Sequence, residues 1–320
     1  MKKIIFFFLL FTEVLFAQKL NNKIVYLDSL FIETSQDSQV YYRIVKDYHL
    51  EKKEYLFTQY YNSDKIESKG NSLNKDHFMK NGEISSFFEN GNQKSVINYE
   101  EGYKIGRCEF WYENGIKKLE GEYFLVENKE KKIESILKIN NFWDLENNQK
   151  VSNGIGNYID DENLINDSKN NSISSGSILN GLKQGTWIGS NKKYKYSFEE
   201  SYNEGILISG ISTDENGQKY NYNVINVNPE PKGGISAFYN FIAKNYNQPE
   251  NLKVSGKVIT SFVVNSQGKI TNIKTIRSLQ TEADEEAIRV IKKHNDFIPG
   301  LSRGIKVDNT YTMPISLKAY

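Results

Sequence analysis

The residues best suited to chemistry are few in this sequence and do not form a recognisable catalytic arrangement. The 320 residues include one cysteine, Cys108, and three histidines, His49, His77 and His294. No His or Asp stands at a spacing from the cysteine that is typical of a nucleophile and its base. The histidines likewise lack metal-ligand spacing. We interpret Cys108 as a small strand residue and predict no metal site, and a single cysteine excludes an internal disulfide.

One acidic cluster also invites a catalytic interpretation. Glu282, Asp284, Glu285 and Glu286 lie at the start of a predicted helix, where carboxylates complement the helix dipole. The sequence has no Gly-x-Ser-x-Gly elbow and no phosphate-binding Gly-Lys-Ser/Thr loop. We therefore predict that the protein is not an enzyme and uses no cofactor or small-molecule substrate. A dispersed triad would leave no such signal, because its residues need to be adjacent only in space.

Composition indicates a mainly β protein. The chain has 21 Tyr and 18 Phe, which favour strands. Its 41 basic and 40 acidic residues give a formal net charge of +1, so there is no general electrostatic attraction to nucleic acid. We expect no nucleic-acid partner.

The first residues have the features of a secretory signal peptide. Lys2 and Lys3 precede an apolar run from Ile4 to Phe16 that is interrupted by Glu13, and the small residue Ala17 follows. We predict a signal peptide at 1–17 and a mature chain in the periplasm or elsewhere in the cell envelope. The alternative is an uncleaved inner-membrane anchor, which is less favoured because a spanning helix needs about 20 apolar residues.

A repeated hairpin pattern follows. The segment Phe87 to Gly91 recurs as Trp111 to Gly115, each ending in Glu-Asn-Gly, and Glu215 to Gly217 repeats that ending. Asn-Gly is a strong hairpin signal because both residues tolerate positive φ. The glycine pairs Gly102 with Gly106 and Gly181 with Gly185 separate these hairpins. The pattern resembles the MORN-type repeats of bacterial proteins, which implies stacked β-hairpins in an elongated sheet.

The composition changes at Asn226, where two prolines and two glycines interrupt the hairpin pattern. We place a domain boundary there. The predicted division is an N-terminal β segment at 18–59, a hairpin repeat region at 60–225 with an irregular insert near 160–177, and a C-terminal domain at 226–320.

Periodicity predicts an α+β domain after this boundary. Its elements, in chain order, are a helix from Gly234 to Asn245, strands from Lys257 to Val264 and from Lys269 to Ile276, a helix beginning at Thr281, and a strand from Val307 to Leu317. Thr281 with Asp284 forms a capping-box-like start. The predicted fold has two helices packed on a three-stranded antiparallel sheet.

This order of elements is similar to the C-terminal domain of the bacterial TonB protein. The matching positions are Pro231, Gly233, Gly234, Gly256, Phe262, Val263, Val264, Gly268, Ala287, Phe297, Ile298, Pro299, Gly300, Gly304 and Tyr311 to Ile315. These residues have structural roles in turns and core, so they identify a fold more than a site. The resemblance implies that the domain binds an extended segment of an outer-membrane receptor or periplasmic partner by adding it as a strand to a sheet edge.

The last strand is the candidate edge. Its predicted partner-binding residues are Thr310, Tyr311, Thr312, Met313, Ile315 and Leu317. Pro314 lacks an N–H, which suits an edge strand but would weaken any ladder formed there.

Energy-transducing members of the family that this domain resembles carry an N-terminal membrane helix followed by a long proline-rich span. Here the N-terminal apolar segment is short and has the features of a cleaved signal peptide, and the hairpin repeats replace the span. We therefore predict a periplasmic protein-binding protein. The alternatives are a membrane-anchored energy transducer for outer-membrane transport and a repeat scaffold that binds the cell envelope. The partner's identity and the oligomeric state stay open.

Overall fold

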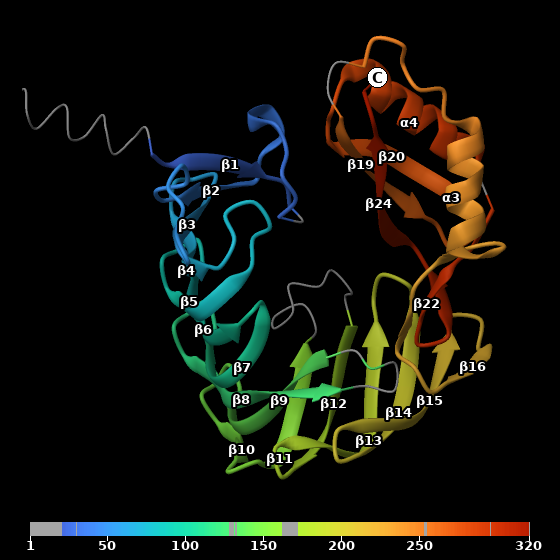
Figure 1. The fold of residues 1–320 in the computed structure, drawn as a ribbon. Coiled ribbons are helices and arrows are strands. Elements are labelled where there is room, and N and C mark those ends of the chain that lie inside the picture. The colour runs from blue at the N-terminus through green and yellow to red at the C-terminus, as the bar shows by residue number, and fades with distance from the viewer. Residues whose placement is uncertain are drawn as a thin grey trace, which may run out of the picture. The chain divides into compact units, whose positions relative to one another are not determined.

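The computed structural model describes residues 21–29, 31–127, 131, 133–161, 172–252, 255–294 and 296–319 (Figure 1). The predicted signal peptide at 1–17 lies outside the described residues. The chain divides into two compact units, of which the first comprises 1–158 with 178–182 and the second 159–177 with 183–320.

The first unit is an antiparallel sheet in which each strand pairs with its neighbours in sequence. A short 3-10 helix, Gln36–Ser38, separates its first two strands. The strands are β1 (Lys23–Leu27), β2 (Tyr41–Val45), β3 (Tyr55–Tyr61), β4 (Ile66–Ser72), β5 (Lys80–Phe87), β6 (Gln93–Glu100), β7 (Tyr103–Trp111), β8 (Lys117–Glu127), β9 (Ile133–Trp143), β10 (Gln149–Ser152) and β11 (Ile155–Asp161).

Two kinds of turn alternate along this sheet. At the predicted Asn-Gly hairpin after β5, the N–H of Phe88 donates to the carbonyl of Asn92 at 2.9 Å, and the N–H of Gly91 donates to the carbonyl of Phe88 at 2.9 Å. The hairpin is confirmed, and both of its turn residues tolerate a positive φ. Only Gly91 adopts it, at 92°, because the side chain of Asn90 instead accepts the N–H of Asn92 at 2.9 Å. The turns with two positive φ values are the short links, such as Glu101 and Gly102 at 49° and 86°.

The second unit begins with strands of the same kind. They are β12 (Ser172–Leu179), β13 (Leu182–Asn191), β14 (Tyr196–Asn203), β15 (Ile206–Asp214) and β16 (Lys219–Tyr222). The end of the predicted irregular insert near 160–177 is therefore a strand, and its residues 162–171 lie outside the described residues. The prediction missed this strand because its buried positions are polar. Ser172 and Ser174 are buried, whereas Ile173 between them is exposed.

The C-terminal part of this unit has the predicted α+β fold. Its elements are β17 (Asn226–Val227), β18 (Glu230–Pro231), α3 (Gly234–Asn245), β19 (Gly256–Val264), β20 (Ile270–Arg277), α4 (Thr281–Lys293), β21 (Phe297–Ile298), β22 (Gly300–Ser302), β23 (Ile305–Val307) and β24 (Asn309–Leu317). The main sheet has three antiparallel strands in the order β20, β19, β24. The predicted last strand is divided at Asp308 into β23 and β24.

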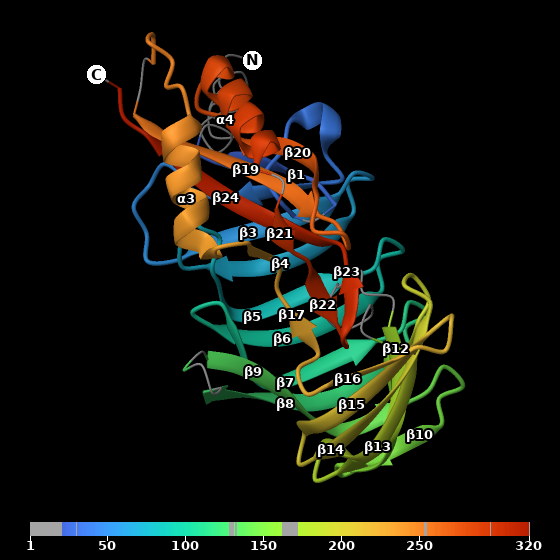
Figure 2. The same ribbon diagram turned by 90° about the vertical axis from the view of Figure 1, so that its right-hand side faces the viewer.

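Both helices bury their apolar faces in one core against this sheet (Figure 2). Phe238 and Ile242 come from α3, Ala287 and Val290 from α4, and Phe262 from β19, and all are at least 96% buried. The predicted capping residue of α4 was wrong by one position. Gln280 is the N-cap, and Asp284 reaches back to accept the N–H of Leu279 at 3.3 Å.

Short strands attach the hairpin of β22 and β23 to the rest of the second unit. The strands β17, β22 and β23 form one small sheet, and β18 with β21 forms another. Arg303, at the tip of the hairpin, is fully buried, and its N–H donates to the carbonyl of Ile225 at 2.6 Å. The hydroxyl of Ser212 in β15 donates to the carbonyl of Arg303 at 2.8 Å. The C-terminal domain is thus joined to β15 by buried hydrogen bonds as well as by the chain.

Candidate functional site

Strand β24 lies at an edge of the three-stranded sheet. It pairs with β19 without a register shift, from Gly256 opposite Leu317 to Val264 opposite Asn309. The sheet order places β19 on one side of β24 and no strand of the described residues on the other. An edge of this kind presents backbone N–H and C=O groups to which another strand can bind.

The side chains of β24 alternate strictly between the core and the exterior. Of the predicted partner-binding residues, Met313, Ile315 and Leu317 are at most 8% exposed and belong to the core, so their side chains face away from a partner. Thr310 and Thr312 are exposed. Tyr311 is half-buried, and its ring stacks on that of Phe262 at 5.3 Å between centroids.

Pro314 indicates which backbone groups of β24 face the open side. A proline has no N–H, so the ladder to β19 keeps every bond when Pro314 belongs to the residues whose backbone groups point away from β19. Because backbone direction alternates along a strand, Thr310, Thr312 and Ser316 then face the open side too. An added strand would find N–H groups at those three residues and a carbonyl at each of the four.

Tyr194 marks one end of this open side. Its hydroxyl accepts the N–H of Asp308 at 3.2 Å and donates to the carbonyl of Asp308 at 3.5 Å. Asp308 and Pro314 are separated by an even number of positions, so their backbone groups point to the same side of the strand. Both contacts of Tyr194 therefore agree with the backbone direction inferred above. Tyr194 lies in the turn between β13 and β14, where Asn191 accepts its N–H at 2.9 Å. Open backbone groups therefore begin at Thr310 and continue to Ser316.

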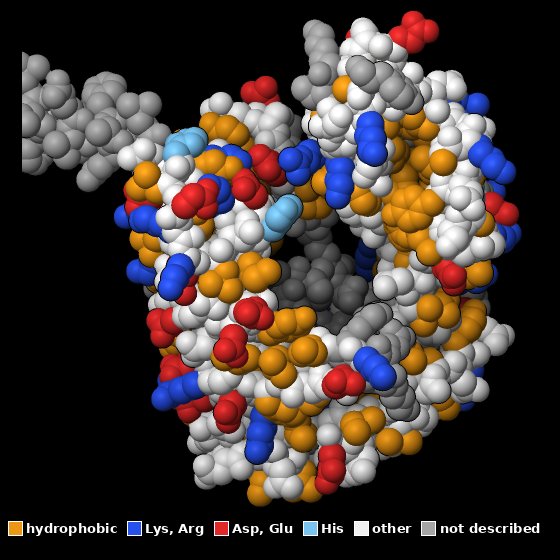
Figure 3. All heavy atoms as spheres, in the orientation of Figure 1, with side chains coloured by type: hydrophobic (Ala, Val, Ile, Leu, Met, Phe, Trp, Pro, Cys, Tyr) orange, Lys and Arg blue, Asp and Glu red, His pale blue; other side chains and the backbone are white. Residues whose placement is uncertain are grey.

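The helix α3 supplies hydrophobic side chains beside this edge. Ile235 and Tyr239, one helical turn apart, are 41% and 44% exposed. Burial raises the pKa of Tyr311, and the nearby Tyr239 and Glu230 raise it further. The space-filling view shows hydrophobic side chains gathered between α3 and β24 (Figure 3). Main-chain groups and an apolar flank together suit an extended peptide segment.

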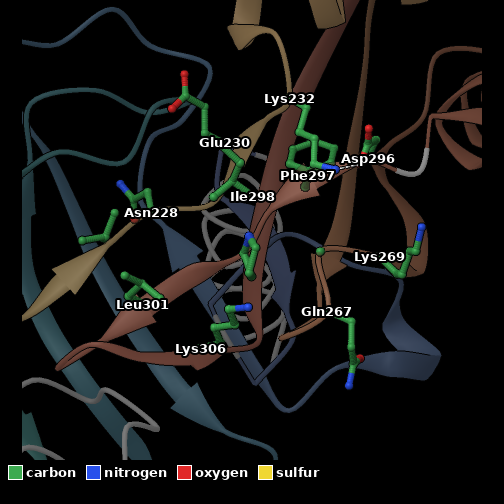
Figure 4. Close-up of a pocket in the computed structure, with 13 residues that line it drawn as sticks. Asn228, Glu230, Lys232, Gln267, Lys269, Asp296, Phe297, Ile298, Leu301 and Lys306 are labelled. Carbon is green, nitrogen blue, oxygen red and sulfur yellow. Dashed lines mark ion pairs between the residues drawn. The ribbon is translucent and has the colours of Figure 1, made fainter. Parts of the chain in front are cut away.

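A pocket of about 560 Å³ lies near the tip of the β19–β20 hairpin (Figure 4). Val227, Ile298 and Leu301 give it an apolar lining. Lys232 and Asp296 form an ion pair at 2.6 Å on one side, and Lys306 lies across from them. The described residues that line the pocket include no nucleophile and no metal-ligand cluster.

The residues first considered for chemistry are divided between the two units. Cys108 is 1% exposed, and burial raises the pKa of its thiol to about 12, so the thiolate is scarce at neutral pH. His49 and His77 lie in the first unit and His294 in the second. Within the described residues, no group of three or more His, Cys, Asp or Glu side chains could hold a metal ion. Tyr194, by contrast, was missed, because a hydroxyl that bonds to backbone 114 positions away leaves no pattern in the sequence.

No helix in the described part of the chain is long and apolar enough to cross a membrane. No curated protein matches the chain. Residues 248–318, which include β19, β20, α4 and β24, match the family model of the Gram-negative bacterial TonB protein C-terminal. Helix α3 precedes the matched range. The C-terminal domain of this chain is therefore similar to a family of domains that take part in protein–protein interactions at the cell envelope.

Proposed function

We propose that this chain binds a protein partner in the cell envelope by accepting an extended segment of that partner as a new strand on the open side of β24. The observation that carries the proposal is the one-sided pairing of β24, which leaves alternate backbone groups from Thr310 to Ser316 open. The apolar flank at Ile235 and Tyr239 supports it, because alternate side chains of an added strand would face α3.

The family likeness points to an outer-membrane receptor or another periplasmic protein as the partner. In this proposal the exported chain is periplasmic, and the hairpin strands, interpreted as MORN-type repeats, act as a spacer or a second binding surface. The protein is a binding module without catalytic function.

The test introduces a proline at the open edge. Thr312→Pro removes an open-side N–H and leaves the ladder to β19 unchanged, and Thr312→Val is the matched control with its N–H intact. A photo-crosslinking amino acid at Thr310 in the full-length protein, expressed in its host, should join it to one short segment of one partner. We expect adducts in the Thr312→Val background and their loss in the Thr312→Pro background.

Crosslinks that persist in the Thr312→Pro protein would contradict strand addition. If the proline variant also kept its localisation and its partners, the scaffold function of the hairpin strands would be favoured instead. N-terminal sequencing of the mature protein distinguishes strand addition and the scaffold function, which both assume export, from an anchored energy transducer. That function requires an intact Met1 in the inner-membrane fraction, whereas export predicts a chain that begins near Gln18.

A further inference from the structure

We propose that the turn between β13 and β14, residues Asn191 to Lys195, ends the binding edge of β24 and selects partner segments that carry acidic residues at that end. This inference rests on the proposed function, because it assumes that a strand is added to β24. It goes further by assigning a charge pattern and a fixed end point to the partner, and by giving part of the recognition to strands outside the family-matched domain.

The end point comes from Tyr194. Its hydroxyl satisfies both backbone groups of Asp308 that would otherwise continue the open edge toward β23. An added strand cannot pair with Asp308 while this contact is present. Pairing is thus confined to Thr310 to Ser316, a stretch of roughly 23 Å at about 3.3 Å per residue. Residues of the partner beyond this stretch must leave the sheet at the turn that holds Tyr194.

The charge comes from the same turn. Lys192, Lys193 and Lys195 flank Tyr194, and all three side chains are exposed. Lys195 is paired with Glu215 at 3.1 Å, and the ammonium of Lys193 lies 4.7 Å from the centre of the Tyr194 ring. Neither Lys192 nor Lys193 forms an ion pair with a described carboxylate. A segment that leaves the sheet here therefore meets two uncompensated positive charges.

The acidic groups nearby do not cancel this charge. The carboxylate of Asp308 accepts the N–H of Ser266 at 2.9 Å and so is turned to the β19–β20 hairpin. Glu215 is engaged by Lys195. Lys306, two residues before Asp308, adds a further exposed positive charge. Charge complementarity then favours Asp or Glu in the part of the partner that lies beyond this end of the added strand.

The experiment selects peptides that depend on the edge. A random library of peptides of about ten residues, displayed on phage, is selected against the full-length mature protein and counter-selected against the Thr312→Pro variant. The same selection is made on a variant with Lys192, Lys193 and Lys195 changed to Ser. The matched control changes Lys244, Lys292 and Lys293 to Ser. These residues lie on α3 and α4, so the net charge changes by the same amount as in the turn variant but at another place. Circular dichroism and hydrogen exchange establish that each variant is folded.

We expect edge-dependent peptides with Asp or Glu concentrated at one end. Their affinity should fall about three- to tenfold in the Lys192, Lys193 and Lys195 variant and stay unchanged in the helix control. Edge-dependent peptides that have no acidic end would overturn the inference and leave the proposed function standing. So would acidic peptides that bind the Lys192, Lys193 and Lys195 variant as tightly as they bind the wild-type protein. If no selected peptide binds the wild-type protein more tightly than the Thr312→Pro variant, both the inference and the proposed function are contradicted.

Discussion

The guanidinium of Arg303 donates from Nε to Oε1 of Glu200 at 2.8 Å, and neither side chain has any exposure to solvent. Tyr202 and Tyr222 donate to the same carboxylate, each at 2.9 Å. The guanidinium also lies 4.0 Å from the centre of the Phe198 ring. This network joins the β22–β23 hairpin to β14 and β16 through a fully compensated charge pair.

Arg303→Met is expected to destabilise the second unit by about 3–5 kcal/mol, because it leaves the Glu200 carboxylate buried without its cation. The free energy of unfolding from urea denaturation measures the loss. Hydrogen exchange should show the largest loss of protection in β22 and β23. A decrease below about 1 kcal/mol would show that solvent reaches Glu200.

The control for that prediction removes both charges. Arg303→Met combined with Glu200→Leu should be more stable than Arg303→Met alone, because no buried charge is left unpaired. A double variant that is no better than the single one would mean that the loss comes from packing against Phe198.

His294 should make the second unit less stable in mild acid. Its ring is packed among Phe238, Phe241 and Phe297 at centroid distances of 4.6, 5.0 and 5.6 Å. Its buried Nδ1 has no hydrogen-bond partner among the residues that the structure describes. Burial lowers the pKa of His294, while the nearby Asp296 raises it to a lesser extent.

A lowered folded-state pKa means that the unfolded chain binds the proton more readily. The contribution of His294 to stability is therefore full above the ordinary histidine pKa of about 6.5 and is lost as the pH falls through the lowered value. Urea midpoints measured from pH 7.5 down to pH 5 should fall less steeply for His294→Phe than for the wild type. Equal slopes for the two proteins would contradict the assignment of this pH dependence to His294.

Gly268 and Gly217 occupy the same backbone conformation, at φ values of 78° and 79°, but differ in their surroundings. A Cβ at Gly268 would lie 2.1 Å from the carbonyl oxygen of Phe297, whereas a Cβ at Gly217 meets nothing within 4 Å. We expect Gly217→Ala to cost about 1 kcal/mol from backbone strain alone. Gly268→Ala should cost about 1–3 kcal/mol more. Equal losses in thermal denaturation would show that the segment at Phe297 moves freely.

Gln59 in β3 connects two buried charges of the first unit. Its side-chain oxygen accepts two bonds from Arg43, at 3.0 and 2.7 Å, and its amide nitrogen donates to Glu67 at 3.0 Å. Burial lowers the pKa of Arg43 to about 10. Gln59→Leu should destabilise the first unit by about 3 kcal/mol, because both charges lose a buried partner. Thr58→Val, on the other face of β3, is the control and should change the urea midpoint little.

Local signals in the sequence were sufficient for much of the fold. The helix from Gly234 to Asn245 was predicted with its observed bounds, because Phe238 and Ile242 repeat at helical spacing after the change in composition at Asn226. The β19–β20 hairpin was predicted from β-branched segments around a glycine turn. These features depend on residues that are close in the chain.

Contacts between distant residues could not be predicted in the same way. Strands β17, β18 and β21 contain two residues each, which is too short for any periodicity. Glu200 looks like a surface residue in the sequence, and only the fold brings it to Arg303, 103 positions away. The edge strand was predicted from the family resemblance and from Pro314, but the end of its open side depends on Tyr194, which contacts Asp308 from 114 positions away.

The unbroken alternation from Lys306 to Leu317 restricts how this region can change in length during evolution. Even-numbered residues in this stretch are exposed, whereas odd-numbered ones are buried or half-buried on the other face. Insertion or deletion of one residue near Asp308 would exchange the two faces, sending Met313 and Ile315 outward and Thr312 into the core. Homologous chains should therefore differ here by even numbers of residues, or compensate an odd change with a β-bulge.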